Sequence, residues 1–300
     1  MLISHPENLS ADAHFEEGDN SASLWWSAVP EVAGETVATI GNCQLGCEES
    51  APDFLRKLLS WSKAHNGSTV IFGPMDGNTW RSHRAVTYSD QRPPFLMEPN
   101  TPASWPAIFE AAGFAPYSAY SSSTVDLTIE QPDFSKLEKR LEDAGVQLRC
   151  INMENFEDEL RSIFQLSLQS FQHNVLYTPI TEAEFMSKYL EAKQMVDPDL
   201  VQLAIDGEEI VGFMFAFPDP IALKSENNPA VIMKTLATKL DRKYSGLGSL
   251  LVNRVHEAAS RKGIQQAYHA LQHESNKSQR LSERFKPTVF RRYTLYAARP

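Results

Sequence analysis

The sequence predicts an α/β (α+β) fold made of two successive halves, each with a sheet flanked by helices. Apolar, β-branched runs alternate with amphipathic helical patterns along the chain. The order hairpin, strand, helix, strand, short helix, strand occurs twice. The length of 300 residues suits about two domains. We therefore expect one domain over residues 1–130, a connector over 131–145 and a second domain over 146–300, with helices covering both faces of the sheet.

In the first half, the polar segment through about Asn20 is expected to be poorly ordered. Two strands joined by a turn at Gly34 are expected to follow it. A helix that ends at Asn66-Gly67 comes next, because its apolar residues recur every three or four positions. The remaining expectations are a buried strand over 68–74, a proline-rich loop over 74–104, a short helix over 104–114 and one or two strands over 117–129.

The second half opens with a charged connector helix and a strand, and then repeats the pattern. Thr181 and Glu184 have the spacing of a helix capping box. The elements expected here are a strand over 146–153, helices over 156–171 and 180–195, a hairpin over 199–219, strands over 228–238, 264–272 and 289–299, a long helix from Gly246 to Gly263 and a short one over 275–285.

Composition excludes several functional classes. The net charge of −10 is concentrated in residues 1–130, and the rest of the chain is neutral, which argues against binding nucleic acid. No apolar run approaches the length of a membrane helix, and the N-terminus does not resemble a secretory signal, so we expect a cytoplasmic protein with no membrane partner. The three cysteines, Cys43, Cys47 and Cys150, lack a zinc-binding spacing and predict reduced, partly buried thiols and no metal.

A strand, a glycine-containing loop and a long helix follow one another in residues 230–263. A helix N-terminus exposes unpaired N–H groups and binds anions such as pyrophosphate. Gly246 and Gly248 let the backbone approach a phosphate closely, and Arg242 and Lys243 add positive charge. The pattern lacks the third glycine of a dinucleotide motif, because position 251 is leucine. A plain helix start with glycines in its turn is the alternative.

This segment resembles the GCN5-related N-acetyltransferase (GNAT) superfamily, whose pyrophosphate loop has the pattern Gln/Arg-x-x-Gly-x-Gly/Ala. Counting from Leu236-Ala237, or back from Gly263, places Lys243 on the Gln/Arg position. The resemblance implies a central mixed, mostly antiparallel sheet flanked by helices, and acetyl-CoA or another acyl-CoA as cosubstrate. The residues that it implies for binding the cofactor are Leu236, Ala237, Thr238, Lys243, Tyr244, Ser245, Gly246, Leu247, Gly248, Ser249, Asn276 and Ser278.

The resemblance identifies no clear catalytic residue. Many members carry a tyrosine about seven residues after the asparagine, where this chain has Glu283; Ser282, Tyr293 or a water are the substitutes. Lys234 stands where the family often has a glutamate. An acceptor amine must lose a proton, and the candidates for accepting it are His269, His273, Glu274 and Asp219. The loop before residue 182 resembles an acceptor-side loop, in which Asn174 and Tyr177 are candidates for contacting substrate.

The first half resembles the same family more loosely, as in two-domain GNAT-like proteins. It lacks a Gly-x-Gly loop, and carboxylates at the start of its helix would repel a pyrophosphate. We interpret it as a GNAT-like domain without a cofactor, the alternative being an unrelated α/β domain. Trp80, Arg81 and Arg84 could line a site, since they combine a flat ring with fixed donors.

The predicted function is that of an acyl-CoA-dependent N-acyltransferase. The simplest form transfers acetyl from acetyl-CoA directly to a primary amine of a small molecule or peptide. The alternative is a non-catalytic acyl-CoA-binding or interaction module, favoured by the missing tyrosine and glutamate.

Overall fold

A computed structural model describes residues 2–4, 10–46, 48–191, 193–224 and 229–300. Its thirteen strands form one continuous sheet in the order β1-β2-β3-β4-β5-β13-β7-β12-β11-β10-β9-β8, with β6 also paired to β13. The strands are β1 (Leu2–Ser4), β2 (Ala13–Glu17), β3 (Asn20–Trp25), β4 (Val37–Leu45), β5 (Val70–Gly73), β6 (Ala85–Ser89), β7 (Ala115–Asp126), β8 (Val146–Cys150), β9 (Val201–Asp206), β10 (Glu209–Pro218), β11 (Ala230–Thr238), β12 (Gln266–His273) and β13 (Thr288–Ala298). The helices are α1 (Ala51–Asn66), α2 (Trp105–Ala111), α3 (Ser135–Asp143), α4 (Phe156–Phe171), α5 (Glu182–Glu191), α6 (Pro220–Lys224), α7 (Leu247–Arg261) and α8 (Lys277–Ser282).

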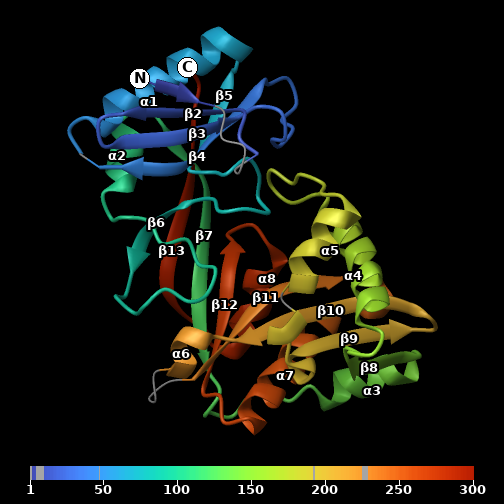
Figure 1. Cartoon of the computed structure of the whole chain (residues 1–300). Helices are drawn as coiled ribbons and strands as arrows, with labels where there is room; N and C mark the ends of the chain where they lie inside the picture. The colour runs from blue at the N-terminus through green and yellow to red at the C-terminus, as the bar shows by residue number, and fades with distance from the viewer. Residues whose placement is uncertain (1, 5–9, 47, 192, 225–228) are drawn as a thin grey trace.

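The sheet is mixed and mostly antiparallel, as predicted, and helices flank it (Figure 1). Among the described strands, two pairs are parallel: β4 with β5, and β11 with β12. In each pair a long helix connects the two strands, α1 in the first half and α7 in the second. The two halves therefore contain the same parallel unit.

The last strand of each half pairs with the sheet of the other half. β13 lies between β5 and β7, with Tyr296 opposite Gly73. β7 lies between β13 and β12, with Val125 opposite Ala267. Figure 1 shows these two long strands running side by side from one half to the other. The boundary at residue 130 stays a prediction, since the sheet is continuous across it.

For residues 10–20, the prediction that the segment through about Asn20 is poorly ordered was wrong. β2 pairs with β3, and the side chains of Ala13 and Phe15 are completely buried. β6 also forms within the stretch expected to be loop. Both strands are short and carry polar residues on one face, so they obtain their stability from pairing with neighbours and give a weak periodic signal.

Each half of the sheet has helices on at least one face. α1 and α2 cover the first half through residues such as Phe54, Leu58 and Phe109. In the second half, α3 and α7 cover one face through a cluster that includes Leu141, and α4 and α5 cover the other through a cluster that includes Phe185. The helix positions follow the predicted periodicity, and the capping box forms as expected, with Thr181 N donating to Glu184 over 2.8 Å.

Candidate functional site

The central feature of the second half is a gap between β11 and β12. The two strands pair in parallel from Ala230 to Met233 and then separate. The register of β11 against β10 shifts at this point and leaves Lys234 as an extra, bulged residue. Beyond it, Lys239 N donates to Val211 O on the β10 side. By strand alternation, the backbone groups of Leu236 and Thr238 face the gap.

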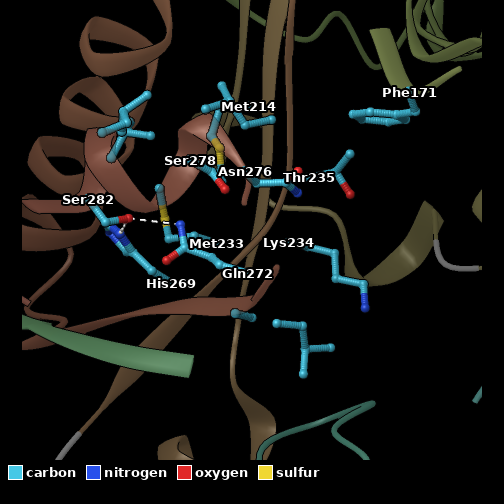
Figure 2. A pocket seen from close by; sticks show the side chains of 15 residues that line it. Phe171, Met214, Met233, Lys234, Thr235, His269, Gln272, Asn276, Ser278 and Ser282 are labelled. Carbon is cyan, nitrogen blue, oxygen red and sulfur yellow. Dashed lines mark hydrogen bonds between the residues drawn. The ribbon is translucent and has the colours of Figure 1, made fainter. Parts of the chain in front are cut away.

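A cavity of about 160 Å³ lies in this gap, between β11, β12, α7 and α8 (Figure 2). Three of the predicted cofactor residues and one predicted catalytic candidate line it: Leu236, Asn276, Ser278 and Ser282. His269, considered as a proton acceptor, lines it as well. Lys234, to which the family resemblance also points, lines the cavity too. The sequence did not single out as site residues the remaining lining residues, which include Phe171, Met214, Met233, Val252, Gln272 and Leu281. They lie on elements that meet only in the folded sheet.

The first turn of α7 lies next to two residues that line the cavity, Leu236 and Leu281. Gly246 is the N-cap of this helix with a φ of +85°, no side chain caps it, and its first turn contains no acidic residue. The first N–H groups of a helix have no intrahelical acceptor. A Cβ on Gly248 would lie 3.0 Å from Leu281 Cδ1 and 3.4 Å from Leu236 Cδ2, two residues that line the cavity. The helix start therefore presents backbone donors beside the gap and fits a phosphate-bearing ligand.

Most of the polar groups just before this helix already bond to other groups of the protein. The Lys243 ammonium pairs with Asp206, and Tyr244 Oη donates to the same carboxylate over 2.7 Å. Lys243 N donates to Asp241 Oδ1, and Ser245 N donates to Arg242 O. Among the described residues of this loop and first turn, the N–H groups of Gly246, Leu247 and Gly248 have no backbone acceptor.

A buried hydrogen-bonded chain closes the inner side of the cavity. His256 Nε2 lies 3.0 Å from His269 Nε2, and His269 Nδ1 lies 2.6 Å from Ser282 Oγ. Gln272 Nε2 donates to the same Ser282 Oγ over 2.8 Å. Burial lowers the pKa of His269 to about 4, and it also lowers the pKa of His256. Both rings are therefore neutral at physiological pH.

The other catalytic candidates lie in different surroundings. His273 accepts at Nδ1 from Ser275 Oγ over 2.8 Å, and its Nε2 lies 3.3 Å from Ser118 Oγ. The Tyr293 hydroxyl bonds to Ser122 Oγ over 3.0 Å and to Glu98 in the core between the halves, and burial raises its pKa.

The two remaining candidates for accepting a proton, Glu274 and Asp219, lie outside the cavity. Glu274 is exposed. Asp219 is buried and accepts from Ile221 N over 3.2 Å before α6.

The predicted acceptor-side loop packs against the first half. Leu176 is buried in a cluster with Met75 and Tyr293, and Trp80 Nε1 donates to Thr178 O over 2.7 Å. Asn174 is exposed. The hydroxyl oxygen of Tyr177 is buried and has no hydrogen-bond partner among the residues that the structure covers.

The equivalent gap in the first half is filled by the chain itself. β4 and β5 pair from Val37 to Thr39 and then separate. The next residues of the chain after β5 occupy the space: Met75 N donates to Ile40 O over 2.7 Å, and Asp76 Oδ1 accepts from Asn42 N over 2.6 Å. The helix that starts here, α1, has a proline and Asp53 in its first turn.

No arrangement of three or more His, Cys, Asp or Glu side chains in the described parts of the chain is suited to a metal ion. Cys43 and Cys150 are free, partly buried thiols, as predicted, and Cys47 lies outside the described residues. Within those same limits, the structure contains no helix with the length and apolar character needed to cross a membrane.

Comparison with solved structures identifies the fold. The GCN5-related glucosamine N-acetyltransferase region of a fungal multi-domain GH3 β-N-acetylglucosaminidase superposes on 93% of this chain and 31% of its own, with a TM-score of 0.57 and 11% identity. A GCN5-related N-acetyltransferase from Sphaerobacter thermophilus gives 0.55 over 94% of this chain and 78% of its own, at 13% identity. A tandem GNAT protein from the clavulanic acid biosynthesis pathway gives 0.53 over 93% and 78%, at 13% identity. The chain has the GNAT fold in its tandem, two-domain form.

Two curated proteins are similar in sequence over part of the chain. Protein YghO from Escherichia coli K12 is 26% identical over 166 residues, which cover 53% of this chain and 41% of that protein. A bacterial ceramide synthase from Caulobacter vibrioides is 26% identical over 150 residues, covering 49% and 39%. The matched segments thus span less than half of these relatives. No family model matches the chain.

Proposed function

We propose that this chain is an acyl-CoA-dependent N-acyltransferase whose cofactor binds in the β11/β12 gap. The observation that carries the proposal is that two features lie near the same cavity. One is the edge of β11 that is unpaired beyond Met233, and the other is the start of α7, which no side chain caps. The pyrophosphate would accept from the first-turn N–H groups of α7. The pantetheine arm would bond to the backbone of Leu236 and Thr238, which brings the thioester close to Lys234, His269 and Ser282.

The hydroxyl of Ser282 is suited to act on the thioester sulfur. A serine oxygen has one proton to donate and two lone pairs. The Gln272 amide group donates to one lone pair. If His269 Nδ1–H donates to the other lone pair, both lone pairs of the Ser282 oxygen are occupied and its own proton is free to bond to another group. Because the Ser282 side chain lines the cavity, that group can be a ligand in the cavity.

The histidine pair favours that assignment. When His269 carries its proton on Nδ1, its Nε2 accepts from His256 Nε2–H, and His256 Nδ1 is an acceptor. That Nδ1 atom is buried and has no partner among the described residues. In the opposite tautomer, His256 Nδ1 would carry a proton and be a buried N–H donor without an acceptor. A buried donor without an acceptor costs more free energy than a buried acceptor without a donor.

The reaction that we propose is direct attack of a neutral amine on the thioester carbon. The C–N bond forms, the C–S bond breaks, and the Ser282 hydroxyl donates a hydrogen bond to the sulfur as it becomes negative. The attacking nitrogen loses one proton and the sulfur gains one, so the transfer is balanced. The similarity to a protein named a ceramide synthase supports amide formation, because a ceramide is an N-acylated amine.

Calorimetric titration with acetyl-CoA and palmitoyl-CoA tests the cofactor site and its acyl length. We expect binding to the wild-type chain, and about 10-fold to 100-fold weaker binding to Gly248→Asp, because a carboxylate in the first turn repels the pyrophosphate. Gly248→Asn is the matched control, since it has the same shape without the charge. Equal affinities for the two variants, or no binding by wild type at millimolar acyl-CoA, would contradict the proposal.

The alternative is a module that binds acyl-CoA without transferring the acyl group. The position of Lys234, where the family often has glutamate, favours it. Release of free thiol from the acyl-CoA in the presence of a mixed amine pool distinguishes the two: the enzyme releases thiol and the module does not.

A further inference from the structure

Positively charged side chains converge where the two halves meet, on the side of the cavity that carries Lys234. Arg84 comes from the segment between β5 and β6, Lys188 from α5 and Lys234 from β11. Figure 2 shows Lys234 extending away from Ser282 and His269, toward the opposite side of the site. The Lys234 ammonium therefore lies apart from Asn276 and Ser278 at the start of α8.

Arg84 is a buried charge without an acidic partner among the described residues. Its side chain is 6% exposed, and its guanidinium carbon lies 3.9 Å above the Tyr120 ring. Its nitrogens donate to the His83 carbonyl over 3.2 Å and to the Leu271 carbonyl over 3.3 Å, and one bonds to the His83 ring. Its backbone has a φ of +79°, an uncommon conformation for a non-glycine residue. The fold thus holds a positive charge against Leu271, which lines the cavity.

Lys234 lines the cavity and has no hydrogen-bond or ion-pair partner in the described part of the chain. Burial, followed by the positive charges of Arg84 and Lys188, lowers the pKa of Lys234 to about 8. Lys188 donates to the Trp80 carbonyl over 3.1 Å, and Glu184 is the acidic group that acts on it. Glu184 in turn is bonded to Thr181 in the capping box.

Such an arrangement is unfavourable unless something compensates it. An uncompensated buried charge costs several kcal/mol, and like charges close together add to that cost. The chain contains 38 Asp and Glu residues, yet the groups acting on Arg84 and Lys234 include no carboxylate. Unpaired cations that face a cavity are typical of sites that bind an anion.

We infer that Lys234, supported by the charge of Arg84, forms an anion subsite for the acceptor, so that the substrate is an amine that also carries a carboxylate or a phosphate. This inference rests on the proposed function and specifies its acceptor. Lys234 extends away from the Asn276 and Ser278 side of the cavity, which belongs to the proposed cofactor site. A carboxylate on the acyl group of the thioester is the other possible source of the same charge, and the test separates the two.

The first experiment uses calorimetry at constant ionic strength to measure the affinity of the chain for inorganic phosphate. We expect phosphate to bind the wild-type chain and to bind Lys234→Met at least about tenfold more weakly, as for loss of one charge-assisted contact. Lys139→Met, at an exposed position of α3, removes the same charge elsewhere and should bind phosphate like wild type. Gly248→Asp should also retain this site, which distinguishes it from phosphate bound at α7.

The second measurement compares thiol release from acetyl-CoA with matched amines, namely phosphoethanolamine with ethanolamine and amino acids with their amides. We expect a preference of about tenfold or more for the acidic member, lost in Lys234→Met and kept in Lys139→Met. A preference for succinyl-CoA over acetyl-CoA with neutral amines would overturn the assignment to the acceptor. Thiol release without either preference, and without phosphate binding, would overturn the subsite and leave the proposed function standing. Phosphate binding that depends on Lys234, with no thiol release from any pair, would support the subsite and contradict the proposed function.

Discussion

The two parallel strand pairs of this protein separate in the same way, but the resulting gaps have different contents. Between β4 and β5, the chain fills the gap with Met75 and Asp76, and the neighbouring helix begins with a proline and an aspartate. Between β11 and β12, a cavity remains, and the neighbouring helix begins with glycine and no acidic residue. The fold alone therefore does not make a cofactor site. On our proposal, the residues after the second strand of the pair, and those in the first turn of the helix, decide whether a ligand can enter.

The largest expected effect concerns the chemistry of the open gap. Ser282→Ala should lower kcat by about 100-fold, because it removes the hydrogen bond to the departing sulfur. Affinity for acetyl-CoA should stay within about twofold of wild type, a change of less than about 0.5 kcal/mol. Ser278→Ala on the same helix is the control, since a residue that contacts the cofactor changes affinity more than kcat. Steady-state thiol release and calorimetry measure the two quantities, and an unchanged kcat in Ser282→Ala would argue against its role.

The second prediction concerns the filled gap. A Cβ on Gly41 would overlap Asp76 Oδ1 and the Met75 carbonyl, so Gly41→Ala should destabilise the fold by about 2–3 kcal/mol. The corresponding fall in Tm is roughly 3–5 °C for a chain of this size. Gly248→Ala meets the flexible ends of the Leu281 and Leu236 side chains and should change stability by less than about 1 kcal/mol. Equal thermal unfolding curves for the two variants would show that the first gap is not tightly filled.

The smallest expected effect concerns the charge at the edge of the open gap. Burial lowers the pKa of Lys234 from 10.5 to about 8. Between these values the unfolded chain binds more protons than the folded chain, so this residue makes stability rise with pH. Lys234→Met should therefore be about 1–2 kcal/mol more stable than wild type at pH 7, with the difference shrinking as the pH rises from 8 toward 10. Chemical denaturation at several pH values measures this, and a difference that does not depend on pH would rule out an unpaired charge.

Much of the second half was predictable from local patterns. α7 follows from the helical spacing of Leu247, Leu250, Leu251 and Val255, and its start follows from two glycines. The positions of Leu236, Asn276 and Ser278 around one cavity followed from the family resemblance. These features depend on residues close together in sequence, which is why they could be recognised.

The rest depends on contacts between distant segments. The pairing of β7 and β13 with the opposite halves joins residues far apart in the sequence, such as Gly73 and Tyr296, and no local pattern encodes it. The same is true of Asp76 in the first gap and of Asp206, which takes up the charge of Lys243. Local periodicity also misses β2, because this short strand turns only two side chains fully into the core.

The most direct test of this account is the stoichiometry of acetyl-CoA binding measured by calorimetry on wild type, Gly248→Asp and Asp53→Asn. We predict one molecule per chain, strong weakening in Gly248→Asp, and no change in Asp53→Asn, because α1 borders a filled gap. Two molecules per chain, or binding that survives in Gly248→Asp, would contradict the claim that only the β11/β12 gap holds the cofactor.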